Sequence, residues 1–211
     1  MKQPDPEETS RAGVSRRGFI RGVGLGTGAL GTGVLEPEAL AQTKAAKVAG
    51  PGAVPVSLNV NGKTHNLTLE PRVTLLDALR DHLDYTGAKR VCDRGTCGAC
   101  TVILAGKAVY SCSVLAIEAQ GREIRTVESL SAGGKYHPLV GAFVDNDAQQ
   151  CGFCTPGFVM ASKALLEQNP DPSYQEVEAG LSGNLCRCGT YMGLRKAVLQ
   201  AAKEMKGGRH A

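Results

Sequence analysis

Four cysteines in the middle of the chain constrain its fold more than any other feature. Cys92, Cys97 and Cys100 are spaced C-x4-C-x2-C, and Cys112 closes the segment CDRGTCGACTVILAGKAVYSC. This is the spacing of a plant-type [2Fe-2S] loop, and four thiolates are what one such cluster needs. A four-cysteine zinc site is the alternative, although zinc sites usually present their cysteines as two short pairs. The spacing therefore favours a [2Fe-2S] cluster.

A second set of four cysteines lies towards the C-terminus. Cys151 and Cys154 form a C-x2-C pair, and Cys186 and Cys188 form a C-x-C pair. The Thr-Pro dipeptide directly after Cys154 predicts a helix start with Thr as N-cap, which would point the positive end of the helix dipole at the thiolates. Zinc is a serious alternative here, because C-x2-C pairs are common in structural zinc sites. The plant-type loop in the same chain favours a second iron-sulfur cluster.

The composition excludes several classes of function. A chain of 211 residues, 42% of them hydrophobic, can form one domain or two small ones. The formal net charge of +4 is too small and too dispersed to indicate nucleic-acid binding. The four histidines, His65, His82, His137 and His210, are scattered along the chain. Neither a Rieske cluster, which needs two histidines, nor a catalytic site of the chain's own is therefore expected.

The first 41 residues have the features of an export signal. Arg16 and Arg17 precede a glycine-rich apolar run at 22–35, and Ala39-Leu40-Ala41 is a small-x-small cleavage site. This order is typical of a twin-arginine signal and predicts a periplasmic protein cleaved after Ala41, with a flexible mature N-terminus at 42–54. The apolar run is too short for a membrane span, which needs about 20 apolar residues. A disordered basic tail is the alternative interpretation.

Export also bears on the interpretation of the cysteines. Exported chains with an even number of cysteines commonly form disulfides. The twin-arginine route carries folded proteins, so a cofactor inserted in the cytoplasm can travel with the chain.

Residues 55–130 have the pattern of a small α+β domain. Strands are expected at 56–60 and 64–69, joined by Asn61-Gly62 in a type I′ turn, and a helix is expected at 74–83 with leucines on one face. Short strands at 101–104 and 108–112, around Gly106-Lys107, and a last strand at 117–126 would complete the sheet. This order of elements predicts a β-grasp, ferredoxin-like domain.

The remainder of the chain lacks strand patterns. Residues 131–137 interrupt both periodicities and are expected to form a linker. Helical segments follow at 138–150, 156–168, 174–185 and 191–206, each with apolar residues on one stripe. Residues 138–208 are therefore predicted to form a four-helix bundle that holds the second set of cysteines.

Three segments together resemble the small iron-sulfur subunit of the xanthine oxidase family of molybdenum hydroxylases. They are the cysteine loop given above, QQCGFCTPGFVMASKALL and LSGNLCRCGTYMGLRKAV. The resemblance implies two [2Fe-2S] clusters, the first on Cys92, Cys97, Cys100 and Cys112 and the second on Cys151, Cys154, Cys186 and Cys188. It also implies that Gln150 and Cys188 approach the molybdenum-pterin cofactor of a large partner subunit.

The resemblance further implies an oxidoreductase subunit in a hetero-oligomer, with the active site on the partner. Electrons would pass singly from molybdenum through the two clusters to an acceptor, either FAD on another subunit or a c-type cytochrome. The twin-arginine leader is most similar to that of the periplasmic aldehyde oxidoreductases. A small subunit of a heteroaromatic-ring hydroxylase, an independent ferredoxin-type carrier and a zinc-stabilised adaptor are the alternatives.

Overall fold

The computed structural model describes residues 15, 17, 19, 48–134 and 136–207. The chain forms two units, Met1–Val48 and Ala49–Ala211. In the first unit, the N–H of Phe19 donates a 2.9 Å hydrogen bond to the carbonyl of Ser15, which closes one helical turn. Arg16, the apolar run at 22–35, the predicted cleavage site and residues 42–47 of the predicted mature N-terminus lie outside the described residues.

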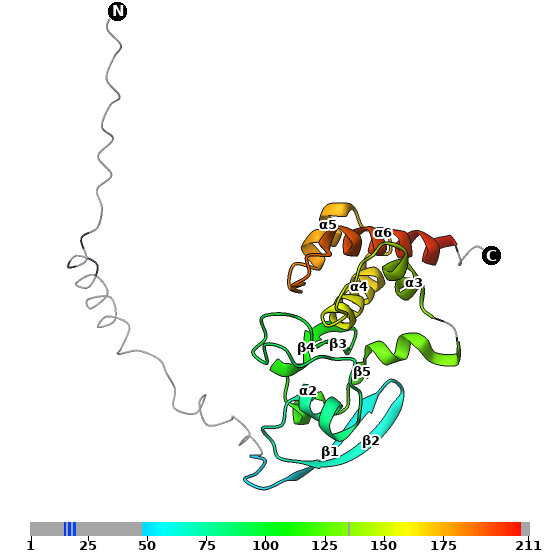
Figure 1. Ribbon diagram of the computed structural model, residues 1–211. Helices are drawn as coiled ribbons and strands as arrows, with labels where there is room; N and C mark the ends of the chain where they lie inside the picture. Colours follow the sequence, from blue (N-terminus) through cyan, green and yellow to red (C-terminus); the bar gives the residue numbers. More distant parts are fainter. Residues whose placement is uncertain (1–14, 16, 18, 20–47, 135, 208–211) are drawn as a thin grey trace, which may run out of the picture. The chain divides into compact units, whose positions relative to one another are not determined.

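The second unit contains a five-stranded sheet with the order β2-β1-β5-β3-β4 (Figure 1). Strands β1 and β5 run parallel, and the other neighbours run antiparallel. The strands are β1 (Val54–Val60), β2 (Lys63–Leu69), β3 (Thr101–Leu104), β4 (Lys107–Tyr110) and β5 (Glu123–Arg125).

The hairpin of β1 and β2 confirms the turn predicted from Asn61-Gly62. Both residues have positive φ, 52° and 78°, and Val60 pairs with Lys63 across the turn. A type I′ turn requires positive φ at both central positions, which Asn and Gly tolerate best. Alternate β1 residues, Val56, Leu58 and Val60, are buried in the core beneath the sheet.

The predicted helix at 74–83 is present in a modified form. Helix α2 (Leu75–Asp77) begins after Thr74, whose hydroxyl accepts a 3.1 Å hydrogen bond from the N–H of Asp77. It continues as a π-helical turn, η2 (Ala78–His82). Leu75, Leu76 and Leu79 are fully buried against the sheet, so the leucine face predicted from the sequence packs as expected.

The prediction for the later strands was partly wrong. Only Glu123–Arg125 of the expected strand at 117–126 is extended, and the 3-10 helix η4 (Ala116–Ala119) occupies its beginning. Ala116 and Ala119 are buried at the three-residue spacing of that helix, and Gly121 with φ 71° ends the turn that follows. Cys112 lies in a second 3-10 turn, η3 (Ser111–Ser113), and not at the end of a strand. The turn between β3 and β4 uses Ala105-Gly106, with φ 48° and 79°.

The C-terminal part of the described chain is helical. The 3-10 helix η5 (Val127–Gly134) includes residues that were predicted to be linker, and α3 (Pro138–Asp145), α4 (Thr155–Gln168), α5 (Tyr174–Gly180) and α6 (Tyr191–Gly207) follow. Helix α3 ends five residues before the predicted boundary, because Asp147 with φ 49° cannot continue it. Helix α5 likewise ends before residue 185. No helix among the described residues is both long enough and apolar enough to span a membrane.

Two apolar cores meet at β3. All four residues of β3 are buried, and Ile103 belongs to the helical core while Val102 belongs to the core beneath the sheet. Figure 1 shows α4 next to β3 and β4, with α5 and α6 farther from the sheet. The contact between α4 and the sheet places the two sets of cysteines near each other.

Candidate metal centres

All eight cysteines are free thiols, and the structure arranges them as four pairs. Within each pair, the side chain of one cysteine shifts the pKa of the other. The pairs are Cys92 with Cys97, Cys100 with Cys112, Cys151 with Cys188, and Cys154 with Cys186. Each predicted set of four therefore comes together as two pairs, and the two sets remain separate.

The first set lies in a loop whose backbone is bent towards sulfur. The N–H of Gly95 donates a 3.3 Å hydrogen bond to the Sγ of Cys112. Gly95 and Gly98 both have φ of 69°, a conformation that residues with a Cβ rarely adopt. A Cβ on Gly95 would lie 2.6 Å from the hydroxyl oxygen of Ser113. The loop therefore has the glycine cradle and the N–H···S bond that a cluster site uses.

Burial and hydrogen bonds shift the pKa values of the thiols in opposite directions. The side chain of Thr96 and nearby backbone N–H groups lower the pKa of Cys92 to about 6. Burial raises the pKa of Cys100 to about 11 and that of Cys154 to about 12. Burial also raises the pKa of Cys186, but hydrogen bonds from Thr190 and the backbone outweigh it and lower the value to about 7. Ligation requires thiolates, which these donors stabilise at one cysteine of each set.

The second set lies at the N-terminal end of α4. Cys154 occupies the N-cap position and makes no side-chain cap hydrogen bond, so the prediction of Thr155 as N-cap was wrong. Thr155 is already inside the first turn with Pro156, and its buried hydroxyl has no hydrogen-bond partner in the protein. The thiols therefore lie beside the positive end of a 14-residue helix and beside a hydroxyl that is free to donate a hydrogen bond. Both features stabilise a bound anionic group.

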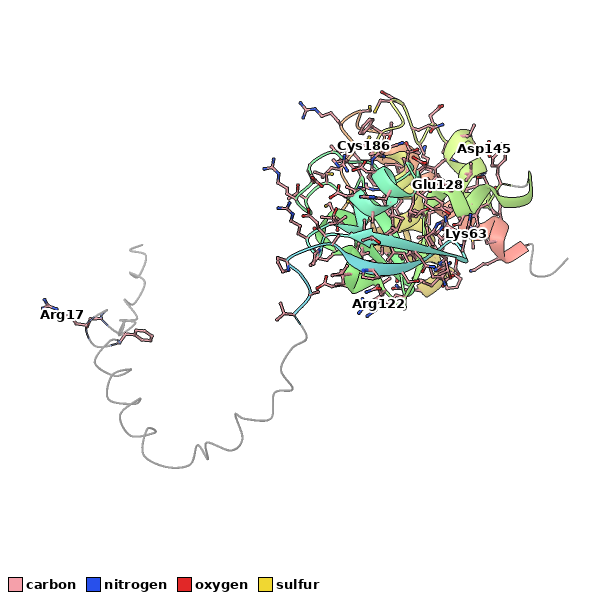
Figure 2. The ribbon with its side chains drawn as sticks, turned by 90° about the horizontal axis from the view of Figure 1, so that it is seen from below. Arg17, Lys63, Arg122, Glu128, Asp145 and Cys186 are labelled. Atoms are coloured by element: carbon pink, nitrogen blue, oxygen red, sulfur yellow. The ribbon has the colours of Figure 1, made fainter. Side chains whose placement is uncertain are left out.

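One side of the second set is open to solvent. Cys151 is exposed, Cys188 is half-buried, and Gln150 lies exposed next to Cys151. Cys154 and Cys186 lie deeper. A small apolar cavity of about 160 Å³ separates the two sets, and it is lined by Val91, Cys97, Ala99, Cys151, Phe153, Cys154, Leu185 and Arg187. Figure 2 shows Cys186 on the opposite side of the unit from Lys63, which begins β2 at the tip of the hairpin.

The donor arrangement fits two [2Fe-2S] clusters. Each iron of such a cluster takes two cysteine thiolates, which matches two pairs at each site. A structural zinc ion instead needs four ligands converging on one point. Among the described residues, no group of three or more His, Cys, Asp or Glu side chains is arranged to hold a single ion.

The structure also shows contacts between the two sites that the sequence did not predict. The N–H of Leu185 donates a 2.9 Å hydrogen bond to the carbonyl of Cys97, and Asn184 bonds to the neighbouring Gly98. Gly157 of α4 packs so closely on Gly98 and Ala99 that a Cβ would overlap their backbone. The position of Asn184 two residues before Cys186 gives no signal for this contact, because its partners lie more than 80 residues away.

Comparisons with known proteins agree with this arrangement. The 2Fe-2S iron-sulfur cluster binding domain matches residues 58–130, and the [2Fe-2S] binding domain matches residues 126–199. The chain thus carries two [2Fe-2S]-binding domains. Each match spans one of the two sets of cysteines.

The similar proteins are subunits of oxidoreductases. The iron-sulfur-binding subunit of an Escherichia coli aldehyde oxidoreductase is 38% identical, over 92% of this chain and 90% of that protein. The small subunit of nicotine 6-hydroxylase from Paenarthrobacter nicotinovorans is 49% identical, over 70% of this chain and 89% of that protein. A chain of quinoline 2-oxidoreductase from Pseudomonas putida superposes with a TM-score of 0.71 and 40% identity, covering 74% of this chain and 98% of that one. The chain therefore belongs to the small iron-sulfur subunits of the xanthine oxidase family of molybdenum hydroxylases, oxidoreductases whose active site lies on the molybdenum subunit.

Proposed function

We propose that this chain is the electron-transfer subunit of a periplasmic molybdenum-dependent aldehyde oxidoreductase. Cys92, Cys97, Cys100 and Cys112 bind one [2Fe-2S] cluster, and Cys151, Cys154, Cys186 and Cys188 bind the other. The observation that carries this assignment is the loop of the first set, whose positive-φ glycines turn the N–H of Gly95 onto the Sγ of Cys112, and the position of Cys154 at the start of α4 supports the second site. A [2Fe-2S] cluster supplies one-electron chemistry, which the side chains of this chain do not offer by themselves.

The open side of the second set is the proposed contact with the large molybdenum subunit. Gln150 and Cys188 lie on this side, where the pterin of the partner would approach them. Large apolar side chains surround it, since Val91 is 54%, Phe153 is 53% and Leu185 is 54% exposed. Exposed apolar side chains gathered at one place are typical of a surface that a protein partner covers.

The first set faces the electron acceptor in this proposal. The loop around Cys92 is exposed at Asp93, Arg94 and Thr96, so a redox partner can approach it. The acceptor is FAD on a further subunit or a c-type cytochrome. We also propose that the sheet with α2 is a β-grasp domain and that α3, α4, α5 and α6 form a four-helix bundle, because each part has its own apolar core.

The aldehyde substrate and the periplasmic location are supported by the extent of one match. The similarity to the Escherichia coli subunit covers 92% of this chain, which is more than residues 48–211 alone can supply. The match therefore extends into the region of the proposed twin-arginine signal. The match to the nicotine 6-hydroxylase subunit covers only 70% of this chain.

A heteroaromatic substrate is the second candidate. The identity of 49% with the nicotine 6-hydroxylase subunit exceeds the 38% with the aldehyde oxidoreductase subunit. An independent ferredoxin-type carrier is disfavoured, because the exposed apolar side chains around Cys151 are typical of a surface that a permanent protein partner covers.

The experiment is to purify the native complex and to measure metals, acid-labile sulfide and electron paramagnetic resonance (EPR) spectra after dithionite reduction. We expect two distinct [2Fe-2S] signals, about four irons per chain, and molybdenum on a co-purifying large subunit. Oxidation of aldehydes but not of nicotine or quinoline analogues would select the first candidate. Zinc in place of iron, or a chain that elutes alone, would contradict the proposal.

A further inference from the structure

The two candidate cluster sites are joined by backbone hydrogen bonds between residues adjacent to their cysteines. The N–H of Leu185 donates to the carbonyl of Cys97 at 2.9 Å. Cys97 belongs to the first set, and Leu185 is followed directly by Cys186 of the second. A continuous path therefore runs from the Sγ of Cys97 through its carbonyl, across one hydrogen bond, and along the backbone to the Sγ of Cys186.

Asn184 fixes the segment that provides this hydrogen bond. Its side chain is buried, with 5% of the residue exposed. Its Nδ2 donates to the carbonyl of Gly98 at 2.9 Å and to the hydroxyl of Thr101 at 3.2 Å. Leu185 and Asn184 thus bond to two consecutive carbonyls of the first loop, those of Cys97 and Gly98.

A second contact holds the same segment from its other end. The hydroxyl of Tyr110 donates to the carbonyl of Gly183. Tyr110 ends β4, and burial raises its pKa, with a further increase from the charges of the nearby first set of cysteines. Residues 183–185 are therefore held against the segment of the first set by hydrogen bonds of two side chains, Asn184 and Tyr110, and by one backbone hydrogen bond.

We propose that Asn184 is a positioning residue that holds the Leu185–Cys97 hydrogen bond as the electron path between the two clusters. One electron crosses in each event, so that the donor cluster is oxidised by one electron, the acceptor cluster is reduced by one, and no bond forms or breaks. Two such events remove the two electrons of one substrate oxidation. This inference rests on the ligand assignment of the proposed function.

The chemistry of the amide explains why Asn is needed at this position. Both of its contacts use N–H donors towards oxygen. Asp has the same shape but only acceptor oxygens when ionised, so it would face the carbonyl of Gly98 with a negative charge. Ala would remove both side-chain hydrogen bonds that tie residue 184 to the first loop, which loosens the segment, although the carbonyl of Gly98 would keep its hydrogen bonds from the N–H and the hydroxyl of Thr101.

The test compares Asn184→Ala and Asn184→Asp with a matched control, Asn146→Ala, in the natively purified complex. Asn146 also donates two hydrogen bonds, to the carbonyl of Ala142 and to Gln200, but both lie within the helical part. Iron content shows whether both clusters are present. EPR of the fully reduced complex measures the magnetic interaction between them, and rapid-freeze EPR after flash photoreduction measures how fast electrons redistribute.

We expect the Asn184 variants to keep both signals, to lose much of the magnetic interaction and to redistribute electrons about tenfold more slowly. The control should match the wild type in all three measurements. Unchanged interaction and rate in an Asn184 variant with both clusters would overturn the inference. If the Asn184 variants lose a cluster, the Tyr110→Phe variant serves as the test, because it removes only the hydroxyl that donates to the carbonyl of Gly183. An unchanged rate of electron redistribution in that variant would also overturn the inference. Absence of two signals in the wild type would instead count against the proposed function.

Discussion

Arg125 in β5 and Glu167 in α4 form a bidentate ion pair, in which each of the two terminal guanidinium nitrogens lies 2.7 Å from a carboxylate oxygen. Lys163, one turn earlier in α4, adds a third contact at 2.9 Å. The side chains are only 15–31% exposed. This arrangement ties the helix that begins at the second set of cysteines to the central strand of the sheet, and therefore contributes to the spacing of the two sites.

Replacing Glu167 by Gln should destabilise the chain at neutral pH. Arg125, followed by Lys163, lowers the pKa of Glu167 from 4.5 to about 2. Because the folded pKa is lowered, the ion pair stabilises the folded state above pH 4.5, and this contribution is lost as the pH falls towards 2. We expect Glu167→Gln to lower the free energy of unfolding by about 1–2 kcal/mol at pH 7. Urea unfolding followed by circular dichroism measures it, since the chain has no Trp.

The control for this prediction is Glu70→Gln. Glu70 also forms an ion pair, with Arg72 at 2.7 Å, but the two side chains are 51% and 86% exposed. Exposed pairs contribute little, so we expect almost no change. Equal effects of the two substitutions, or a difference between wild type and Glu167→Gln that grows below pH 4.5, would contradict the assignment.

Replacing Gly98 by Ala should separate the two sites. A Cβ at this position would lie 2.6 Å from the amide of Asn184 and 2.9 Å from the carbonyl of Gly183, and φ is 69°. We expect a loss of about 2 kcal/mol or more in unfolding free energy, and a loss of iron from the first site. Thermal unfolding and iron analysis measure both effects.

Gly106→Ala is the matched control for the substitution at Gly98. Gly106 has a φ of 79°, yet no atom lies within 4 Å of the position of its Cβ. This variant therefore reports the cost of the backbone strain alone, about 1 kcal/mol, with the iron content unchanged. If the two variants behave alike, the close contact between the sites is not important.

The parts of the fold that local chemistry determines could be predicted from the sequence. The Asn61-Gly62 turn and the alternation along β1 are local patterns, and the structure confirms both. The cysteine spacing likewise indicated two separate sets, because short loops limit which thiols can meet. The leucines of α2 are buried as predicted, although the helix widens after Asp77.

The parts that depend on distant contacts could not be predicted. Residues 117–120 alternate between apolar and polar like a strand, but Ala116 and Ala119 pack as a 3-10 helix beneath the sheet. Thr155 has the sequence of an N-cap, yet the helix begins one residue earlier because Cys154 turns into it. The bonds of Asn184 to Gly98 and Thr101 follow from the packing of α4 on β3, which no local pattern encodes.

Cys92→Ser should remove one cluster and leave the other. The two sets share no cysteine, and the thiols that shift the pKa values of Cys151 and Cys154 belong to the second set. We expect about half of the iron and the complete loss of one EPR signal, with the remaining signal unshifted.

The reciprocal variant is the control for Cys92→Ser. Cys154→Ser should remove the signal that Cys92→Ser leaves. Loss of both signals from either variant, in protein that keeps its circular dichroism spectrum, would show that the sites do not form independently.

Replacing Arg16 and Arg17 together by Lys should stop export. The proposed twin-arginine signal depends on the arginine pair before the apolar run at 22–35, and Lys keeps the positive charge without the planar guanidinium. We expect the complex to carry both clusters but to remain in the cytoplasm, which cell fractionation and immunoblotting of the unprocessed chain measure. Arg11→Lys, outside the pair, is the control and should be exported normally. Periplasmic protein at the wild-type level in the double variant would contradict the signal and would favour the basic-tail interpretation of the first 41 residues.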